Sequence, residues 1–442
     1  MIRYSIHMKE VPVLYLRNEP AEVYLESVVD RLLHKPVSGM IERSHMNHSD
    51  PYYEEACHLH REVPVVDAHN DLAGELLLRH QRGEERVIER LYLPHWKAAG
   101  FQLIVSSIYI ENSIFFPDNE EARGIGNAEK KDWNYYWNRQ ALCWDAGFAN
   151  ALAQIREIKK ELAELPEELC LVTCRDDLTA IRKREKIGIL LYMEGLDCIG
   201  VDVSRIHTLY QLGVRGASLT WSRPNLLAVG CCSATKHTDI PGPITSLGWQ
   251  VLEALQQHHM FLDISHLNHE GWEQIDRQYT TEYSRRSSYV PYIATHSNSC
   301  TVYSSYRNLT DRQMSALASQ GGIMGLNACK YIVGCDDPAD YLDAMCCHME
   351  YIVNKIHATH LGFGFDLCDS YSRARYRIDT PSCGDPSFPA DRTQRFLPED
   401  CLQNHKEALL LTARLLKRGM HEQNVLRILG LNWLEYFALL LE

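Results

Sequence analysis

Short apolar runs alternate with amphipathic segments along most of this chain. The apolar runs lie at 63–66, 102–110, 187–195, 214–221, 260–267, 290–297, 321–327 and 360–366. Helical patterns lie between them, at 134–164, 204–212, 246–258, 269–279, 311–319 and 339–357. Short strands that alternate with helices are typical of parallel βαβ units. Eight such strands predict an α/β fold, a closed (β/α)8 barrel of the TIM type, rather than an open sheet.

The first part of the chain does not follow this alternation. Residues 1–47 contain one strand-like run, VPVLYL, and one amphipathic helical pattern, AEVYLESVVDRLLHK. We interpret them as an N-terminal arm or extension, which either packs on the main domain or serves as an oligomer contact. Residues 48–442 form the predicted barrel domain. Its first helix is expected over 52–62, because Ser49-Asp50-Pro51 is a typical helix start.

Metal-binding and acidic residue types recur at the ends of the predicted strands. His69 and Asp71 follow the first run, Glu194 ends the third, His266 the fifth, His296 the sixth and Asp366 the eighth. Each one alone has an ordinary explanation, a hydrogen bond to a neighbouring loop. In a barrel, however, the carboxyl ends of all strands meet on one rim, where active sites are assembled. The pattern therefore predicts one shared site.

The residue types on this rim suit a pair of divalent transition metal ions such as zinc. Glu194 stands alone on its strand and is the expected bridge between two ions. The remaining ligands are expected in two pairs, His69 with Asp71 and His266 with His296. Two cations roughly 3.5–4 Å apart can convert a shared water to hydroxide at neutral pH. Asp366 is then the spare carboxylate that shuttles a proton, and the predicted reaction is hydrolysis of an amide or ester.

Composition narrows the class of protein. A net charge of -13 argues against a nucleic-acid partner and against an anionic membrane surface. No run reaches the roughly 20 apolar residues of a membrane span, and the charged first residues make a poor signal peptide. The 15 cysteines are odd in number and irregularly spaced, which does not fit a disulfide framework. We expect a cytoplasmic protein with mostly reduced thiols.

The motifs on the rim, taken in order, resemble the membrane dipeptidase (renal dipeptidase) family of zinc peptidases. They are VVDAHNDL, MEG, GVRGASLTW, ATHSN, YRNLTD, GGIMGLN and HLGFGFD, and the likeness runs from about Pro51 to the C-terminus. The resemblance implies a metal-dependent hydrolase barrel with two zinc ions that cleaves dipeptides, including those with a C-terminal D-residue. It implies the same ligands as above, with Glu194 bridging and Asp366 as the catalytic acid/base.

Two further site residues follow from the resemblance alone. Arg307, in YRNLTD, matches the arginine that binds the free carboxylate of the substrate; without the family it would be read as a surface ion pair. Trp221 stands where the animal enzymes have a histidine that contacts the substrate, and tryptophan cannot take up a proton. Another departure is Cys368 with Asp369, in place of the end of the more usual D-F-D-G motif.

The predicted function is therefore a zinc-dependent dipeptidase acting on L,L and L,D dipeptides, with a homodimer as the expected assembly. One alternative keeps the barrel and its metals but changes the substrate to an N-acyl amino acid, another small amide, a lactone or a phosphoester. The other alternative is a non-catalytic barrel that serves as a binding or assembly protein. The full ligand set speaks against the second.

Overall fold

The strands form one parallel sheet that closes on itself. The structure is a computed structural model, and it describes residues 51–111, 114, 133–231, 241–281, 285, 289–376 and 399–441, of which 133–142 and 376 are described by their backbone alone. The strands are β1 Val65–Asn70, β2 Phe101–Tyr109, β3 Leu169–Leu171, β4 Ile187–Glu194, β5 Val214–Ser218, β6 Phe261–Asp263, β7 Met324–Leu326 and β8 Leu361–Phe363. Their order is β6-β5-β4-β2-β1-β8-β7, with β3 off this path. The predicted 1–47 arm lies outside the described residues.

The ring closes at Ile293 and Ala294. Ile293 bridges to β6 and Ala294 to β7, with backbone hydrogen bonds of 2.8–3.0 Å on both sides. The sequence predicts a full sixth strand over 290–297, whereas the structure forms strand bridges in this segment at these two residues, with one further backbone hydrogen bond from Ser297 N–H to Gly325 O at 2.8 Å. The reason lies in side chains: Asp263 Oδ1 accepts the N–H of Thr295, and Ser265 Oγ accepts the N–H of His296, so neither N–H continues the ladder. With this segment in place the barrel has its eight strand positions.

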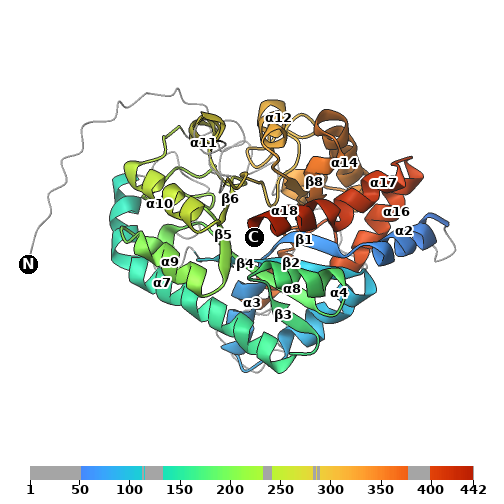
Figure 1. Ribbon diagram of the computed structural model, residues 1–442, viewed down its shortest axis with the longest axis horizontal. Coiled ribbons are helices and arrows are strands. Elements are labelled where there is room, and N and C mark those ends of the chain that lie inside the picture. The colour runs from blue at the N-terminus through green and yellow to red at the C-terminus, as the bar shows by residue number, and fades with distance from the viewer. Residues whose placement is uncertain are drawn as a thin grey trace, which may run out of the picture. The chain divides into compact units, whose positions relative to one another are not determined.

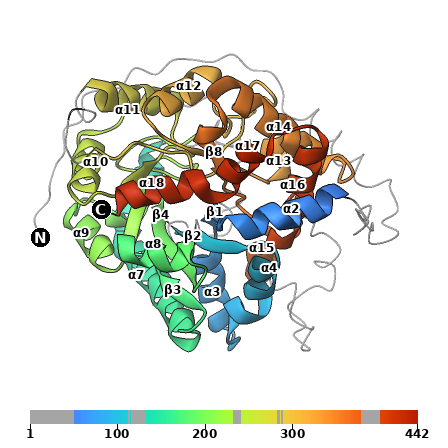
Figure 2. The same ribbon diagram turned by 45° about the vertical axis from the view of Figure 1, so that its right-hand side comes forward.

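Helices surround the strands in both ribbon views (Figures 1 and 2). In chain order they are α2 Pro51–Glu62, α3 Leu72–His80, η1 Ile88–Tyr92, α4 Leu93–Ala98, α7 Trp133–Glu164, α8 Arg175–Arg182, η3 Asp197–Ile199, α9 Ser204–Gln211, α10 Ser246–Gln257, α11 His269–Thr281, α12 Asp311–Ser319, α13 Lys330–Val333, α14 Tyr341–Ile356, η5 Ala358–His360, α15 Asp369–Tyr376, η7 His405–Glu407, α16 Ala408–Lys417, α17 Glu422–Leu426, η8 Arg427–Leu431 and α18 Asn432–Leu440. The helices predicted between the strands are all present. In the described ranges, none of them combines the length and apolarity that a bilayer crossing needs.

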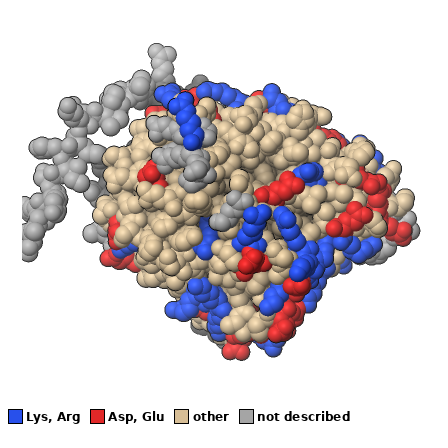
Figure 3. Space-filling model, in the orientation of Figure 1, with Lys and Arg blue, Asp and Glu red and all other residues tan. Residues whose placement is uncertain are grey.

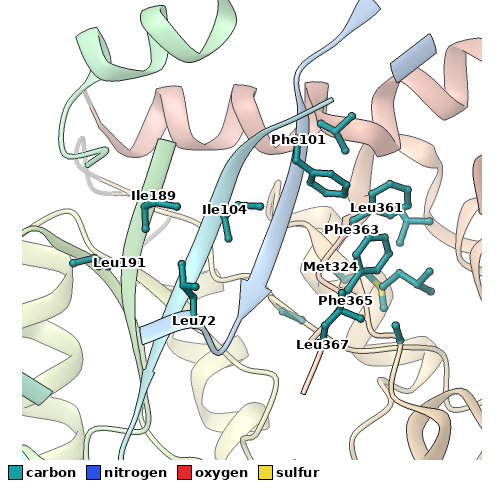
Figure 4. Packing of buried hydrophobic residues seen from close by; sticks show 14 of the residues in the cluster. Leu72, Phe101, Ile104, Ile189, Leu191, Met324, Leu361, Phe363, Phe365 and Leu367 are labelled. Atoms are coloured by element: carbon teal, nitrogen blue, oxygen red, sulfur yellow. The ribbon is translucent and has the colours of Figure 1, made fainter. Parts of the chain in front are cut away.

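The buried core explains the long apolar runs. All eight residues of β4 are buried, as expected for a parallel strand with both faces covered. Figure 4 shows Ile189 and Leu191 of this strand beside Ile104 of β2, with Phe101 and Phe363 packed further along the barrel. Helix α18 adds its own contacts: Trp433 Nε1 donates to Phe363 O at 3.0 Å, and a Cβ at Gly362 would come within 2.1 Å of that nitrogen.

Many of the charged residues lie on the surface, whereas a few, such as Asp67 and Glu194, are buried. Acidic and basic side chains are interspersed on the face of the molecule drawn in Figure 3. Ion pairs between helices, such as Arg418–Glu350 at 2.7 Å, are partly exposed and add little stability each. The described cysteines are free thiols.

Candidate metal centre

The six metal-type and acidic residues predicted from the strand ends lie on one rim of the barrel. His69 is the fifth residue of β1, Asp71 precedes α3, and Glu194 is the last residue of β4. His266 lies three residues after β6, His296 two residues after the 293–294 segment, and Asp366 three residues after β8. Because the strands are parallel, these positions share the carboxyl end of the barrel. The structure brings all six together.

Glu194 is at the centre of this group. Its Oε1 lies 2.9 Å from His266 Nε2, 3.4 Å from His296 Nε2 and 3.7 Å from His69 Nε2. The two imidazole nitrogens of His266 and His296 are themselves 3.0 Å apart. One carboxylate within reach of three imidazoles is the arrangement that a bridging ligand requires.

Carboxylates flank the other side of His69. Its Nε2 is 3.7 Å from Asp71 Oδ1 and 3.5 Å from Asp366 Oδ1. Asp71, Asp366 and Cys368 place ligand-type atoms within 4.8 Å of one another, and so do His69, Glu194 and His296. Cys368 is one of the two residues that replace the end of the more usual D-F-D-G motif, and it was not predicted as a site residue. The division of the ligands between two ions stays a prediction.

Hydroxyl groups orient the three histidines. Tyr192 Oη is 2.5 Å from His69 Nδ1, Thr295 Oγ1 is 2.7 Å from His296 Nδ1, and Ser222 Oγ is 2.9 Å from His266 Nδ1. In each case the Nδ1 atom is engaged and Nε2 faces the pocket. A metal-binding histidine typically has this arrangement, in which the second nitrogen is held by a neighbouring polar group.

The tautomer of His296 follows from one further contact. Thr295 Oγ1 donates to Asp263 Oδ2 at 2.7 Å, since a carboxylate can only accept. The hydroxyl has a single proton, so it must accept from His296 Nδ1–H. His296 Nε2 then carries a lone pair directed at the pocket. Neither Asp263 nor Thr295 was predicted as a site residue, although both adjoin predicted ligands in FLDISH and ATHS.

A second buried network fixes the end of β1. Asp67 Oδ1 accepts the N–H groups of His69 and Phe365, at 3.3 and 2.9 Å. Its Oδ2 pairs with His405 Nε2 at 2.9 Å. Asp67 therefore ties the His69 strand to the segment that leads from β8 to Asp366. No sequence pattern pointed to His405, which lies far along the chain in η7.

The residues of this site are suited to bind divalent cations. His69 Nε2 is fully buried and has no hydrogen-bond partner, which is uncommon for a buried polar atom. Burial alone would lower the pKa of His69, but Glu194, Asp71 and Asp366 outweigh it and raise that pKa to about 10. Burial also raises the pKa of Glu194 and of Asp366. A divalent cation among these groups would take the place of the protons that they otherwise retain and would favour the ionised carboxylates.

The pKa values of the other two imidazoles move in the opposite direction. Burial lowers the pKa of His266 and His296 well below the usual value, and the positive charges of Arg307 and His69 add to the effect. Neutral imidazole is the form that binds metal. The site therefore presents two neutral imidazole nitrogens beside the Glu194 carboxyl group.

Arg307 and Trp221 lie beside the histidines. Arg307 is almost fully buried and donates to the carbonyl oxygens of Ser265 and His296, the latter at 3.3 Å. The Trp221 ring centroid is 5.7 Å from that of His266 and 5.1 Å from that of Tyr109. Arg307 thus braces the two loops that carry His266 and His296, and Trp221 flanks the same corner. Their contacts with a substrate stay predictions.

Comparisons with known proteins identify the family. A model described as membrane dipeptidase (peptidase family M19) matches residues 53–375. Rat dipeptidase 3 is 27% identical over 398 residues, which cover 88% of this chain and 68% of that protein. A metallo peptidase from Rhodobacter sphaeroides, solved with a phosphinate mimic of the dipeptide L-Ala-D-Ala, gives a TM-score of 0.65 at 21% identity over 85% of this chain and 98% of its own.

A solved structure of the dipeptidase AC, also a metallo peptidase of family M19, gives a TM-score of 0.63 at 21% identity over the same shares. These structural likenesses confirm the (β/α)8 fold that the strand and helix pattern predicts. The family match confirms the resemblance carried by the rim motifs, and it spans most of the barrel domain. The chain belongs to the membrane dipeptidase family of peptidases.

Proposed function

We propose that this metallo-dipeptidase hydrolyses L,L and L,D dipeptides at a binuclear zinc centre bridged by Glu194. The observation that carries the proposal is the convergence of three imidazole Nε2 atoms within 3.7 Å of Glu194 Oε1, one of them buried with no hydrogen-bond partner. In this proposal the other ligands are His69 and Asp71 for one ion and His266 and His296 for the second. When bound, the ions supply an activated water and polarise the scissile carbonyl.

Asp366 moves the proton in the proposed reaction. Its N–H donates to His69 O at 3.1 Å, and its Oδ2 accepts from Asn327 Nδ2 at 2.9 Å. These bonds hold Asp366 at a φ of 57°, a left-handed conformation that a non-glycine residue adopts only under constraint. Burial raises the pKa of this carboxyl, which suits a group that takes a proton from water and passes it to the leaving amine.

Arg307 binds the free carboxylate of the dipeptide. A guanidinium carries five N–H groups, and the carbonyls of Ser265 and His296 accept from one on each Nη atom. The remaining N–H groups can form the paired hydrogen bonds that a carboxylate accepts. Such a clamp, fixed close to the ligand loops, selects a substrate that ends after its second residue.

Trp221 shapes the substrate wall next to His266. It offers an apolar ring and one N–H donor but no proton acceptor, so it can pack against a substrate side chain without taking part in proton transfer. The tolerance of a C-terminal D-residue is supported by the Rhodobacter sphaeroides relative, whose structure contains an L-Ala-D-Ala mimic. A cytoplasmic location and a homodimer stay predictions for this chain.

The test uses the full chain purified without added metal. Elemental analysis is expected to give two zinc ions per chain. A panel of L,L and L,D dipeptides, the same dipeptides amidated at the C-terminus, N-acyl amino acids, lactones and phosphoesters should show turnover of the free dipeptides alone. Equal turnover of the amidated dipeptides would contradict the carboxylate clamp. Turnover of lactones or phosphoesters in place of dipeptides would contradict the substrate class.

A further inference from the structure

A thiol stands among the carboxylates of the candidate metal centre. Cys368 lies between β8 and α15, two residues after Asp366. Its Sγ is 3.3 Å from Asp366 Oδ1 and 3.9 Å from Asp71 Oδ2. The thiol and the two carboxylates therefore face a common space, and Cys368 belongs to neither of the predicted ligand pairs.

His69 lies beside the same two carboxylates. Its Nε2 lies 3.7 Å from Asp71 Oδ1 and 3.5 Å from Asp366 Oδ1, is fully buried, and has no hydrogen-bond partner. The His69 nitrogen, an Asp71 oxygen and the Cys368 sulfur are donor types that bind divalent transition metal ions, and Asp366 lies beside them as the proposed proton-transfer group.

The sulfur of Cys368 has more hydrogen-bond acceptors around it than one thiol can use. Three acceptors lie around it, because the carbonyl oxygen of Asp366 is 3.2 Å away in addition to the two carboxylate oxygens. One S–H group can donate to only one of them at a time. The backbone is fixed independently of the thiol, since Asp400 accepts the N–H groups of Cys368 and Asp369 at 3.1 and 2.8 Å. These backbone hydrogen bonds hold the loop in place, so the loop does not depend on a hydrogen bond from the thiol.

We propose that Cys368 is a metal ligand of this chain, binding through Sγ the ion that His69 and Asp71 hold. The inference rests on the proposed binuclear centre and deepens it. On metal binding the S–H bond breaks, its proton goes to solvent, and a sulfur–metal bond forms. A thiolate is a soft ligand, so this subsite prefers Zn²⁺ or Cd²⁺ to Mn²⁺ more strongly than an all-oxygen and nitrogen site would.

Cadmium is the probe, because a cadmium–thiolate bond has a charge-transfer absorption in the ultraviolet that nitrogen and oxygen ligands do not produce. Metal-depleted full-length protein is titrated with Cd²⁺ up to two equivalents, and affinities for Cd²⁺ and Mn²⁺ are measured by competition with a chelator. The wild type should show the band. Cys368→Ser and Cys368→Ala should lack it and bind Cd²⁺ on the order of tenfold more weakly, with little change for Mn²⁺.

Cys57→Ser is the matched control, because it removes another partly exposed thiol, in α2, and should keep the band. Two Cys368 variants are used, so that the test can still be made with one if circular dichroism shows that the other does not fold. A band that persists in both, or unchanged Cd²⁺ affinity, overturns the proposal. A wild type without the band that still binds two ions and cleaves dipeptides removes the sulfur ligand but leaves the proposed function, whereas a chain that binds no metal removes both.

Discussion

Replacing Thr295 with valine removes one hydroxyl from the hydrogen bonds that orient the histidines, with almost no change in side-chain shape. Thr295 Oγ1 donates to Asp263 Oδ2 and accepts from His296 Nδ1, both at 2.7 Å. It also lies 3.3 Å from His69 Nδ1. The variant leaves a buried carboxylate oxygen and a buried ring nitrogen without these partners.

The structure sets the size of the effect. A hydrogen bond to a charged group contributes about 1.5–3 kcal/mol and one between neutral groups about 1 kcal/mol, so losing both should lower the free energy of unfolding by about 2.5–4 kcal/mol. His296 would also lose the contact that fixes its tautomer. Loss of such a supporting contact typically costs roughly 10–100-fold in metal affinity.

Thr412→Val is the matched control. Thr412 Oγ1 is 2.9 Å from His60 Nε2, and both residues are buried where α16 packs against α2. The same substitution there removes a similar threonine–histidine hydrogen bond that does not contact the metal centre. It should reduce the free energy of unfolding by about 1 kcal/mol and leave metal affinity unchanged.

The assay pairs urea unfolding of the metal-depleted proteins with chelator competition for Zn²⁺. Thr295→Val should lose both stability and metal affinity, and Thr412→Val stability alone. Wild-type zinc affinity in Thr295→Val would refute the reasoning that Thr295 orients His296. An equal loss of affinity in both variants would mean that lower stability, rather than ligand orientation, weakens metal binding.

Three other perturbations test separate parts of the chain. Asp366→Asn should lower kcat by roughly 10²–10⁴-fold while elemental analysis still finds both ions, and a fully active variant would exclude Asp366 from proton transfer. Arg307→Ala should mainly raise KM for dipeptides, by roughly 10–100-fold for a charge-assisted pair, and an unchanged KM would exclude the clamp. Burial lowers the pKa of His60 and of His348 from 6.5 to about 4. The unfolded chain therefore binds more protons between these values, so stability present above pH 6.5 should fall as the pH drops toward 4. Urea unfolding with chelator present should show a shallower pH slope in His348→Gln, and an unchanged slope would contradict this assignment.

The parts of the site that the sequence predicts are those that depend on position along one strand. Glu194 is the last residue of a strand of eight buried residues, and His69 lies next to the end of β1, so both positions fall on the rim that the strand ends define. The positions of strands and helices follow from local sequence periodicity, and in a barrel the carboxyl ends of all strands meet on one rim. For this reason the rim residues could be named before their distances were known.

The supporting residues depend on contacts between distant segments, which periodicity does not encode. His405 reaches Asp67 across 338 positions of the chain, and nothing in its local sequence distinguishes it from any other helical histidine. The shortened sixth strand has a similar origin, because Asp263 and Ser265 take the backbone N–H groups that an extended ladder would use. Side chains that compete for backbone hydrogen bonds override the strand preference of the sequence between Val290 and Ser297.

The charges of the site residues explain how so many ionisable side chains can be buried side by side. Burial raises the pKa of Glu194, and at the same time the carboxylates around His69 raise its pKa to about 10, so without a cation the group retains protons. Buried charges that are only partly paired lower the stability of the folded chain. A divalent ion replaces those protons with a charge that all the ligands share, so binding should release protons and raise the free energy of unfolding together. This cluster lowers the stability of the fold when no ion is bound and raises it when ions bind, as expected for a metal site. A histidine–carboxylate network with a purely structural role would stabilise the fold without an ion.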